Sequence, residues 1–326
     1  MVHPVVRSAG IDTAKLCWRL SVDSPAGRAA GSLATIPTSR AMQLPDKING
    51  HRVLWYPAAG LLAAEGHPGG AGNLAPADSL PNYVALMSGS LREYGIDVPD
   101  DPVRFDHSRH GFAGFGRLDV TVNLDTHSTP AGLAILSGVA AIQPDARLQT
   151  IVIRQPGARA IETIAWRGKR GIVARTYDKS TESLSGPRAT LVRFEDQRRW
   201  PTNTRRQTAE LDASAVRDIF CRRFAPLWQA SRGVHVVTTT RAAQLLRDAV
   251  TREEITARQA VNAAGHLFLA QADVRIGPRT TQWRHRRIAQ ALGLVLVDGE
   301  IAEQQVDIDL GQVLEQVVDG NHWAHG

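Results

Sequence analysis

The sequence predicts an α+β fold, in which a mostly antiparallel sheet with helices is followed by a helical C-terminal region. Three patterns indicate this. Residues 118–124 alternate apolar and polar side chains and are rich in β-branched residues, which is typical of a strand. A short turn at 167–171 separates two strand-like segments and predicts a hairpin. After Pro201, helical periodicity replaces the β-branched runs.

A chain of 326 residues is long enough for two domains, and we expect them at 1–205 and 206–326, with the boundary near Arg205. From their β-branched and alternating residues, strands are expected at 11–22, 52–56, 118–124, 150–154, 160–166, 172–177 and 190–196. From their periodicity, helices are expected at 79–94 (ending at Gly95), 130–141, 209–225, 242–250 and 257–269. Gly and Pro indicate loops at 66–76 and 97–109, and 277–297 reads as loop, helix and short strand.

Composition favours a polyanionic partner. The net charge is +6, and 34 of the 38 basic residues are arginines, whose planar guanidinium matches phosphate groups. Codon usage in a GC-rich genome is the alternative explanation for the arginines, since alanine is also abundant. Cys17 and Cys221 are far apart and match no zinc spacing. The longest apolar run, 131–142, is too short to span a bilayer. We therefore expect a cytoplasmic protein with no membrane contact.

Three residue types with complementary chemistry lie on strand-like segments. Tyr177 stands among cations and shares a strand face with Arg175, Asp119 lies on the polar face of 118–124, and Glu195 shares a face with Arg193. If the three strands are neighbours, two carboxylates and one phenol meet on a polar face. The alternative is structural: a strand carboxylate beside an arginine is more often a salt bridge, and a strand tyrosine is usually half-buried packing.

Such a group is suited to phosphoryl transfer. Carboxylate oxygens bind Mg²⁺ or Mn²⁺, which polarises a scissile phosphate. A phenol attacking in line would form a 5′-phosphotyrosyl bond and leave a free 3′-hydroxyl. The ordinary pKa of a phenol is about 10, so the neighbouring cations Arg175 and Lys179 would help the phenolate to form.

The order of the motifs resembles the filamentous-phage gene II and gene X replication initiators and their plasmid relatives. Four segments carry the resemblance: GIDTAKL at 10–16, GRLD at 116–119, YDKSTE at 177–182 and VRFE at 192–195. The segment ETIAW at 162–166 resembles the family's sequence just before the tyrosine, and TQWRHRR at 281–287 resembles its C-terminal basic helix. The similarity is collinear over about 10–294, whereas the loop at 66–76 departs from the family's tighter segment.

The resemblance implies a nuclease core that nicks and rejoins origin DNA to start rolling-circle replication. Tyr177 would be the nucleophile, Asp119 and Glu195 the metal ligands, Glu162 a third ligand, and Lys179 a phosphate contact. The His-hydrophobe-His signature of other nickases is absent, since the histidines in 107–110 have a different spacing. The sequence has no Walker A loop, so a host helicase and polymerase are the expected partners.

Two basic clusters are candidate contacts to double- and single-stranded DNA. The first follows the strand at 190–196 and contains Arg193, Arg198 and Arg199, with Trp200 as a base-stacking residue. The second lies in an expected recognition-like helix near 279–292 and contains Arg284, Arg286 and Arg287. For each cluster, a solvated charged surface is the alternative interpretation.

Two other functions stay open. The chain could be a non-catalytic DNA-binding regulator of the same lineage, or a mobilisation relaxase that acts on a transfer origin. With a single nucleophilic tyrosine, termination would need a second protomer in a dimer or an attacking water.

Overall fold

The computed structural model describes residues 4–70, 73–98, 111–142, 145, 147–154, 160–169, 171–182, 190–201, 205–271, 288–289, 291–296 and 306–323. The chain forms two compact units, each assembled from separate stretches of sequence. The first unit contains Met1–Arg7, Val122–Phe194 and Arg222–Asp319, and the second contains Ser8–Thr121, Glu195–Cys221 and Gly320–Gly326. Strands β6 (Gly111–Asp125) and β10 (Leu191–Arg199) contribute residues to both units. The expected boundary near Arg205 stays a prediction.

The second unit is built on an antiparallel sheet. Its strands follow the order β2-β3-β4-β5-β1-β6-β10. They are β1 (Val5–Arg19), β2 (Ile36–Pro37), β3 (Met42–Gln43), β4 (Arg52–Tyr56) and β5 (Leu61–Gly66), together with β6 and β10. The register places Glu65 of β5 opposite Lys15 on one side and Arg52 on the other. Glu65 therefore lies between two basic side chains.

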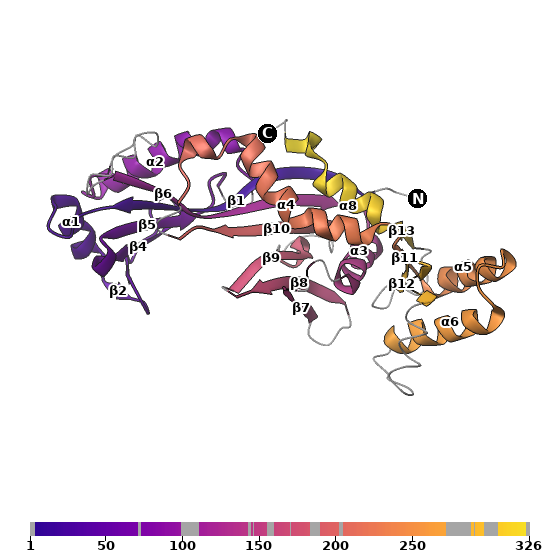
Figure 1. The fold of residues 1–326 in the computed structure, drawn as a ribbon. Coiled ribbons are helices and arrows are strands. Elements are labelled where there is room, and N and C mark those ends of the chain that lie inside the picture. Colours follow the sequence, from indigo (N-terminus) through magenta and orange to yellow (C-terminus); the bar gives the residue numbers. More distant parts are fainter. Residues whose placement is uncertain are drawn as a thin grey trace. The chain divides into compact units, whose positions relative to one another are not determined.

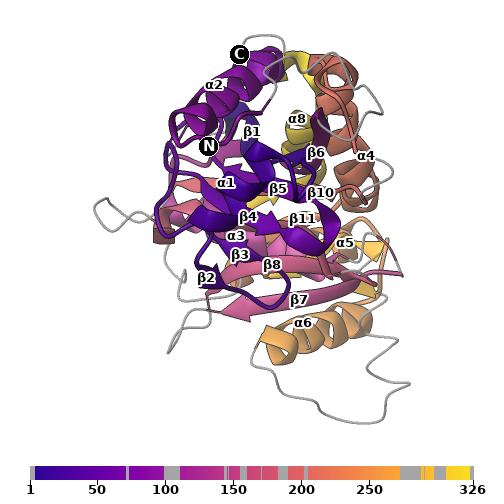
Figure 2. The same cartoon turned by 90° about the vertical axis from the view of Figure 1, so that its left-hand side faces the viewer.

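Two helices accompany this sheet, α1 (Pro25–Leu33) and α2 (Leu80–Glu93) (Figure 1). Helix α1 begins where the Ser24 side chain accepts a hydrogen bond from the Gly27 backbone N–H. Helix α2 buries an apolar face against the sheet and is followed by Gly95, whose φ of +76° lies in the left-handed region that favours glycine. In Figure 2, α2 lies across the strands of this unit.

The first unit contains the other half of the strand series, in the order β6-β10-β9-β8-β7. Its hairpins are formed by β7 (Gln149–Arg154), β8 (Ile161–Gly168) and β9 (Gly171–Asp178), which pair antiparallel. Helix α3 (Thr129–Ala141) starts at the Ser128 cap and packs on β8 and β9. The expected hairpin around 167–171 is confirmed.

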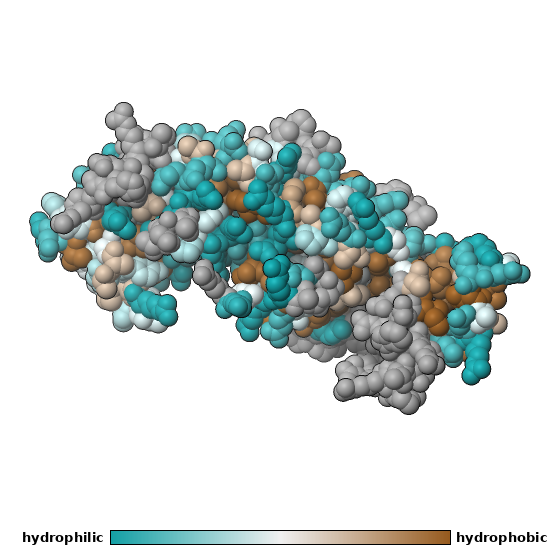
Figure 3. Space-filling view, viewed as in Figure 1, coloured by the Kyte–Doolittle hydropathy of each residue, from teal (hydrophilic) through white to brown (hydrophobic). Residues whose placement is uncertain are grey.

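A three-stranded sheet in the order β12-β11-β13 completes the first unit. Strand β11 (His235–Val237) pairs parallel with β12 (Leu294–Leu296) and antiparallel with β13 (Asp307–Asp309). The helices of the C-terminal part are α4 (Ala213–Ser231), α5 (Thr239–Thr251), α6 (Ala257–Gln271) and α8 (Leu310–Val318). An apolar cluster joins β11, β12, α5 and α6, and hydrophobic residues reach the surface around α5 and α6 in Figure 3.

The α+β class and the large antiparallel sheet agree with the sequence-based expectation. One expectation needs correction: the C-terminal region contains β11 and β13 besides its helices and the expected short strand. Between residues 22 and 52, where no helix or strand was expected, the chain forms α1, β2 and β3. These strands of two or three residues were not predicted, because so few residues cannot show a period. Within the part of the chain that the structure describes, no helix combines the length and apolar character needed to cross a membrane.

Candidate functional site

The second unit buries two of the expected metal ligands, Asp119 and Glu195. On β6, Leu118 and Val120 are fully buried, and strand alternation turns Asp119 to the opposite face. Asp119 is 1% exposed and Glu195 of β10 is fully buried. A buried carboxylate needs charged or hydrogen-bonding partners to remain ionised. The surroundings of these two side chains therefore decide what they can do.

Arg117 is the principal partner of this acidic group. Its Nε donates to Asp119 Oδ1 at 2.7 Å, and its Nη2 donates to Oδ2 of the same carboxylate. Its Nη1 donates to Glu65 Oε1 at 2.7 Å. Burial acts to lower the pKa of Arg117, but the hydrogen bond and charge of Asp119, followed by the charges of Glu65 and Glu195, raise it overall. Three carboxylates thus surround one guanidinium.

Polar groups at the edges of this arrangement orient the carboxylates. Gln197 Nε2 donates to Glu195 Oε1 at 2.9 Å, and Arg52 Nη2 donates to Glu65 Oε2 at 3.3 Å. Thr121 lies two residues after Asp119 on the same strand face, and its buried Oγ1 has no hydrogen-bond partner among the residues that the structure describes. A buried hydroxyl without a partner is costly, and an ion or water that contacted it would remove this cost.

The donor set of this group fits a hard divalent cation. Oxygen ligands and excess negative charge are the preference of Mg²⁺ and Mn²⁺, and Mg²⁺ is commonly held by one or two carboxylates together with substrate phosphates. Each carboxylate oxygen has two lone pairs, so Asp119 can accept from Arg117 and still bind a cation. In the described ranges, no set of three or more His, Cys, Asp or Glu residues is arranged around one metal position. Substrate phosphate and the Thr121 hydroxyl would complete such a site.

Tyr177 belongs to the first unit, on β9. It lies opposite Thr163 of β8, and Arg175 lies opposite Ala165, so Tyr177 and Arg175 share a face as the sequence predicts. The Arg175 Cζ is 5.0 Å from the centroid of the Tyr177 ring, within cation–π range. The tyrosine is 5% exposed. Its approach to Asp119 and Glu195 stays a prediction, since those residues belong to the other unit.

The segment after Tyr177 is held by a local turn. Asp178 accepts hydrogen bonds from Ser180, at 3.1 Å from the backbone nitrogen and 2.6 Å from Oγ. Burial raises the pKa of Asp178, although the bonds from Ser180 oppose the change. Lys179 is half-buried and begins the 3₁₀ helix Lys179–Glu182 directly after the tyrosine. The turn therefore fixes Lys179 close in sequence and space to Tyr177.

Glu162 does not follow the simple strand alternation. The β7–β8 pairing shifts register between Ile153 and Arg154, which pair with Thr163 and Ile161, so Glu162 is the extra residue of an irregularity. Bulges of this kind re-aim side chains, and sequence periodicity cannot place them. Its role as a third metal ligand stays a prediction.

The expected DNA contacts differ in their surroundings. Arg193 is 2% exposed and its Nε donates to Asn123 Oδ1 at 2.8 Å, and its role as a DNA contact stays a prediction. Arg198 and Arg199 are exposed at the end of β10. Arg284, Arg286 and Arg287 lie outside the described residues, as do the histidine segment at 107–110 and most of the expected helix near 279–292.

Sequence reasoning missed Glu65 and assigned no role to Arg117 or to the Thr121 hydroxyl. Arg117 and Asp119 are two apart on a strand, which by itself signals a same-face pair. No sequence signal identifies Glu65, because it meets Arg117 across 52 positions of chain. Comparison with known proteins finds no matching family model, no similar curated protein and no similar solved structure.

Proposed function

We propose that this chain is a DNA-nicking and rejoining enzyme of the rolling-circle initiator type, with Tyr177 as nucleophile and Asp119 and Glu195 as ligands of Mg²⁺ or Mn²⁺. The observation that carries the proposal is the pair of buried carboxylates on adjacent strands β6 and β10, gathered around Arg117 beside the Thr121 hydroxyl, which has no partner among the described residues. The cationic surroundings of Tyr177 support the same chemistry.

The residues divide the reaction between them. A bound divalent cation supplies Lewis-acid polarisation of the scissile phosphate, and Asp119 and Glu195 would hold it. Tyr177 loses its phenolic proton and its oxygen bonds to phosphorus, while the bond from phosphorus to the 3′ oxygen breaks. That oxygen takes up a proton and becomes a 3′-hydroxyl. Rejoining is the reverse, since the 3′-hydroxyl attacks the phosphotyrosyl phosphorus and releases the phenol.

Positive side chains beside the phenol lower the cost of this step. Arg175 lies over the Tyr177 ring, so negative charge that develops on the phenolic oxygen is stabilised electrostatically. Lys179, two residues on, would contact a non-bridging phosphate oxygen. Arg198 and Arg199, exposed after the carboxylate strand, would hold the DNA backbone.

A second candidate is a non-catalytic DNA-binding regulator, and one observation favours it. Both oxygens of Asp119 accept hydrogen bonds from Arg117, which is the arrangement of a structural ion pair. A regulator would keep this pair for stability alone. The two functions differ in whether loss of a carboxylate abolishes cleavage while leaving DNA binding intact.

The test is a nicking assay on supercoiled plasmid that carries the DNA flanking the gene for this chain. Purified wild-type protein is incubated with Mn²⁺ or Mg²⁺, and nicked circle is scored after denaturation. We expect Asp119→Asn and Glu195→Gln to lose cleavage and to retain the gel shift of the same DNA. The matched control is Glu210→Gln, which removes an exposed acid paired with Arg206. Binding by the wild type without cleavage under either metal selects the regulator.

A further inference from the structure

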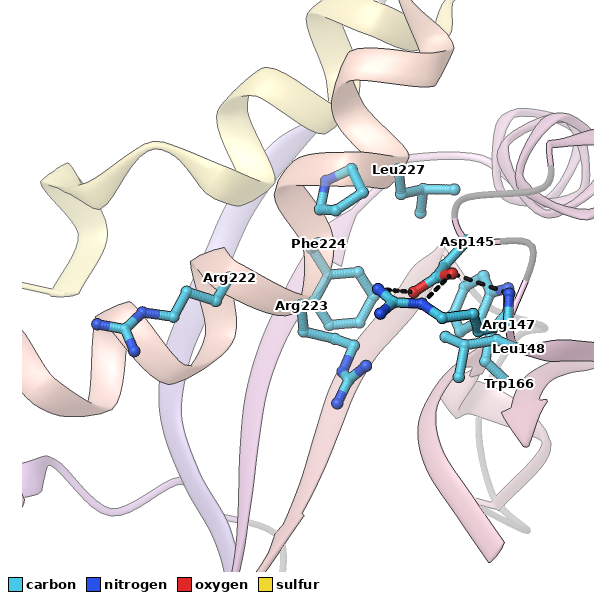
Figure 4. A pocket seen from close by; sticks show the side chains of 9 residues that line it. Asp145, Arg147, Leu148, Trp166, Arg222, Arg223, Phe224 and Leu227 are labelled. Atoms are coloured by element: carbon cyan, nitrogen blue, oxygen red, sulfur yellow. Dashed lines mark hydrogen bonds and ion pairs between the residues drawn. The ribbon is translucent and has the colours of Figure 1, made fainter. Parts of the chain in front are cut away.

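Within the first unit, a cavity of about 220 Å³ lies between helix α4, strand β8 and the turn that precedes β7 (Figure 4). Its apolar wall is formed by Trp166 and Phe224, whose rings meet edge to face at 6.1 Å, with leucine side chains from α4 and the turn. Charged residues from the turn and from α4 border it: Asp145, Arg147, Arg222 and Arg223. The nicking chemistry proposed above uses none of these residues.

The charge around the cavity is predominantly positive. Its lining residues include three arginines and one carboxylate. Arg147 holds Asp145 through its Nε at 3.1 Å and its Nη2 at 3.0 Å, and the charge of Arg223 also acts on that carboxylate. These hydrogen bonds, with the backbone N–H of Arg147, lower the pKa of Asp145. Asp145 therefore occupies, beside the Arg147 guanidinium, the kind of position that a ligand anion would take.

The directions of the side chains divide the arginines. In Figure 4, Arg147 reaches toward Asp145, and the Arg223 side chain extends from α4 below Phe224. The side chain of Arg222 extends away from the pair along the other side of the helix. Arg222 thus has the same charge as Arg223 and is its neighbour on the same helix, but its side chain has a different orientation.

One further feature supports a ligand site here. Trp166 is 2% exposed, and its indole Nε1 has no hydrogen-bond partner in the described part of the chain. A buried N–H donor of this kind normally has an acceptor, which a ligand in the cavity would supply. Pro226 also lines the cavity from inside α4.

We propose that this cavity binds a phosphate ester, with the phosphate between Arg147 and Arg223 and the attached organic group against Trp166 and Phe224. Arginine matches phosphate through paired N–H donors, and its charge is retained at any physiological pH. The volume is below the range of about 300–1,000 Å³ that is usual for drug-sized ligands, so the site takes a single phosphorylated unit. That unit is a free nucleotide or one nucleotide of a DNA strand.

The experiment measures binding of three probes by isothermal titration calorimetry on the full chain: inorganic phosphate, dTMP and a short oligodeoxythymidylate. We expect saturable binding of dTMP or of the oligonucleotide. Arg147→Gln and Arg223→Gln should each weaken it about tenfold, since each removes charged hydrogen bonds. Arg222→Gln is the matched control and should change the affinity by less than about twofold. Asp145→Asn should tighten binding, because it removes the internal competitor.

The probes distinguish the two sources of the ligand. Binding of dTMP that competes with the oligonucleotide identifies a free nucleotide site, and binding of the oligonucleotide alone identifies a contact to the DNA backbone. The proposal is overturned if no probe binds saturably, or if Arg222→Gln weakens binding as much as Arg223→Gln, which would indicate general attraction to positive charge. Circular dichroism of each variant verifies that it is folded. Because Tyr177→Phe leaves this site intact, its binding result is separate from the success or failure of the nicking assay.

Discussion

Replacing Arg117 by methionine tests the buried ion pair at the centre of the candidate site. The change keeps an unbranched apolar side chain and removes the guanidinium, so Asp119, 1% exposed, is left with a charge that its main partner no longer compensates. Removing one partner of a buried ion pair costs about 3–5 kcal/mol. Arg117 and Glu65 are 20% and 17% exposed, so water screens part of this loss. We therefore expect destabilisation of about 3 kcal/mol, at the lower end of the range.

A double-mutant cycle separates the charge from the packing of the side chain. In an Asp119→Asn background the buried carboxylate is already gone, and Arg117→Met should cost only about 1 kcal/mol for its remaining contacts. The coupling energy is then about 2 kcal/mol. The free energy of unfolding is measured by urea denaturation followed by far-ultraviolet circular dichroism. Additive costs, or a single-variant cost under about 0.5 kcal/mol, would refute the reasoning that Arg117 and Asp119 form one unit.

The same variant reports on metal binding. Loss of Arg117 frees the Asp119 oxygens and makes the group more negative, so Mn²⁺ should stabilise Arg117→Met more than it stabilises the wild type. A cation at a hundred times its dissociation constant adds about 2.7 kcal/mol to the free energy of unfolding. The control is Asp119→Asn, which should gain nothing from Mn²⁺. Equal stabilisation of all three proteins would place the cation elsewhere.

Three further predictions concern the fold. Burial lowers the pKa of His51 below its ordinary 6.5, so the folded state favours neutral His51, and the stability that this provides is present above pH 6.5 and lost as the pH falls. His51→Phe should therefore flatten the dependence of the melting temperature on pH between pH 5 and 7. An unchanged dependence would contradict the prediction. A Cβ at Gly138 would lie 2.5 Å from Val236 Cγ2, so Gly138→Ala should lower the free energy of unfolding in urea by about 1–3 kcal/mol. The control is Gly89→Ala, which has open space around it and should stabilise α2 by up to about 1 kcal/mol. The reverse order of stability would show that α3 can shift to make room for the new methyl group. Phe224→Ala should cost about 3–5 kcal/mol in urea unfolding, because this buried ring contacts two other aromatic rings. A loss of under about 1 kcal/mol would contradict this prediction.

The sheet was the most predictable part of the fold. Residues 118–124 alternate apolar and polar side chains, and a short turn joins the hairpin strands at 160–166 and 172–177, so both show strong local patterns. The small sheet of β11, β12 and β13 was less predictable. Its strands have three residues each and come together from positions up to 74 residues apart along the chain, as His235 pairs with Asp309.

The candidate site was predictable only in part. The alternation of β6 placed Asp119 on the face opposite Leu118 and Val120, as expected. Glu65 could not be found, since it is joined to the site by tertiary pairing alone. The direction of the Glu162 side chain could not be predicted from strand alternation, because the register of the β7–β8 pairing shifts at this residue. Local patterns set which face a side chain takes, whereas long-range pairing sets which side chains meet.

The most direct test of the account is to map the covalent adduct. Wild-type protein is incubated with Mn²⁺ and supercoiled plasmid carrying the flanking DNA, digested with nuclease and protease, and analysed by mass spectrometry. The account predicts a nucleotide bonded to the peptide that contains Tyr177, at its phenolic oxygen, and no adduct with Tyr177→Phe although that variant still binds DNA. An adduct on another residue, or cleavage by Tyr177→Phe, would contradict the assignment of Tyr177 as the nucleophile.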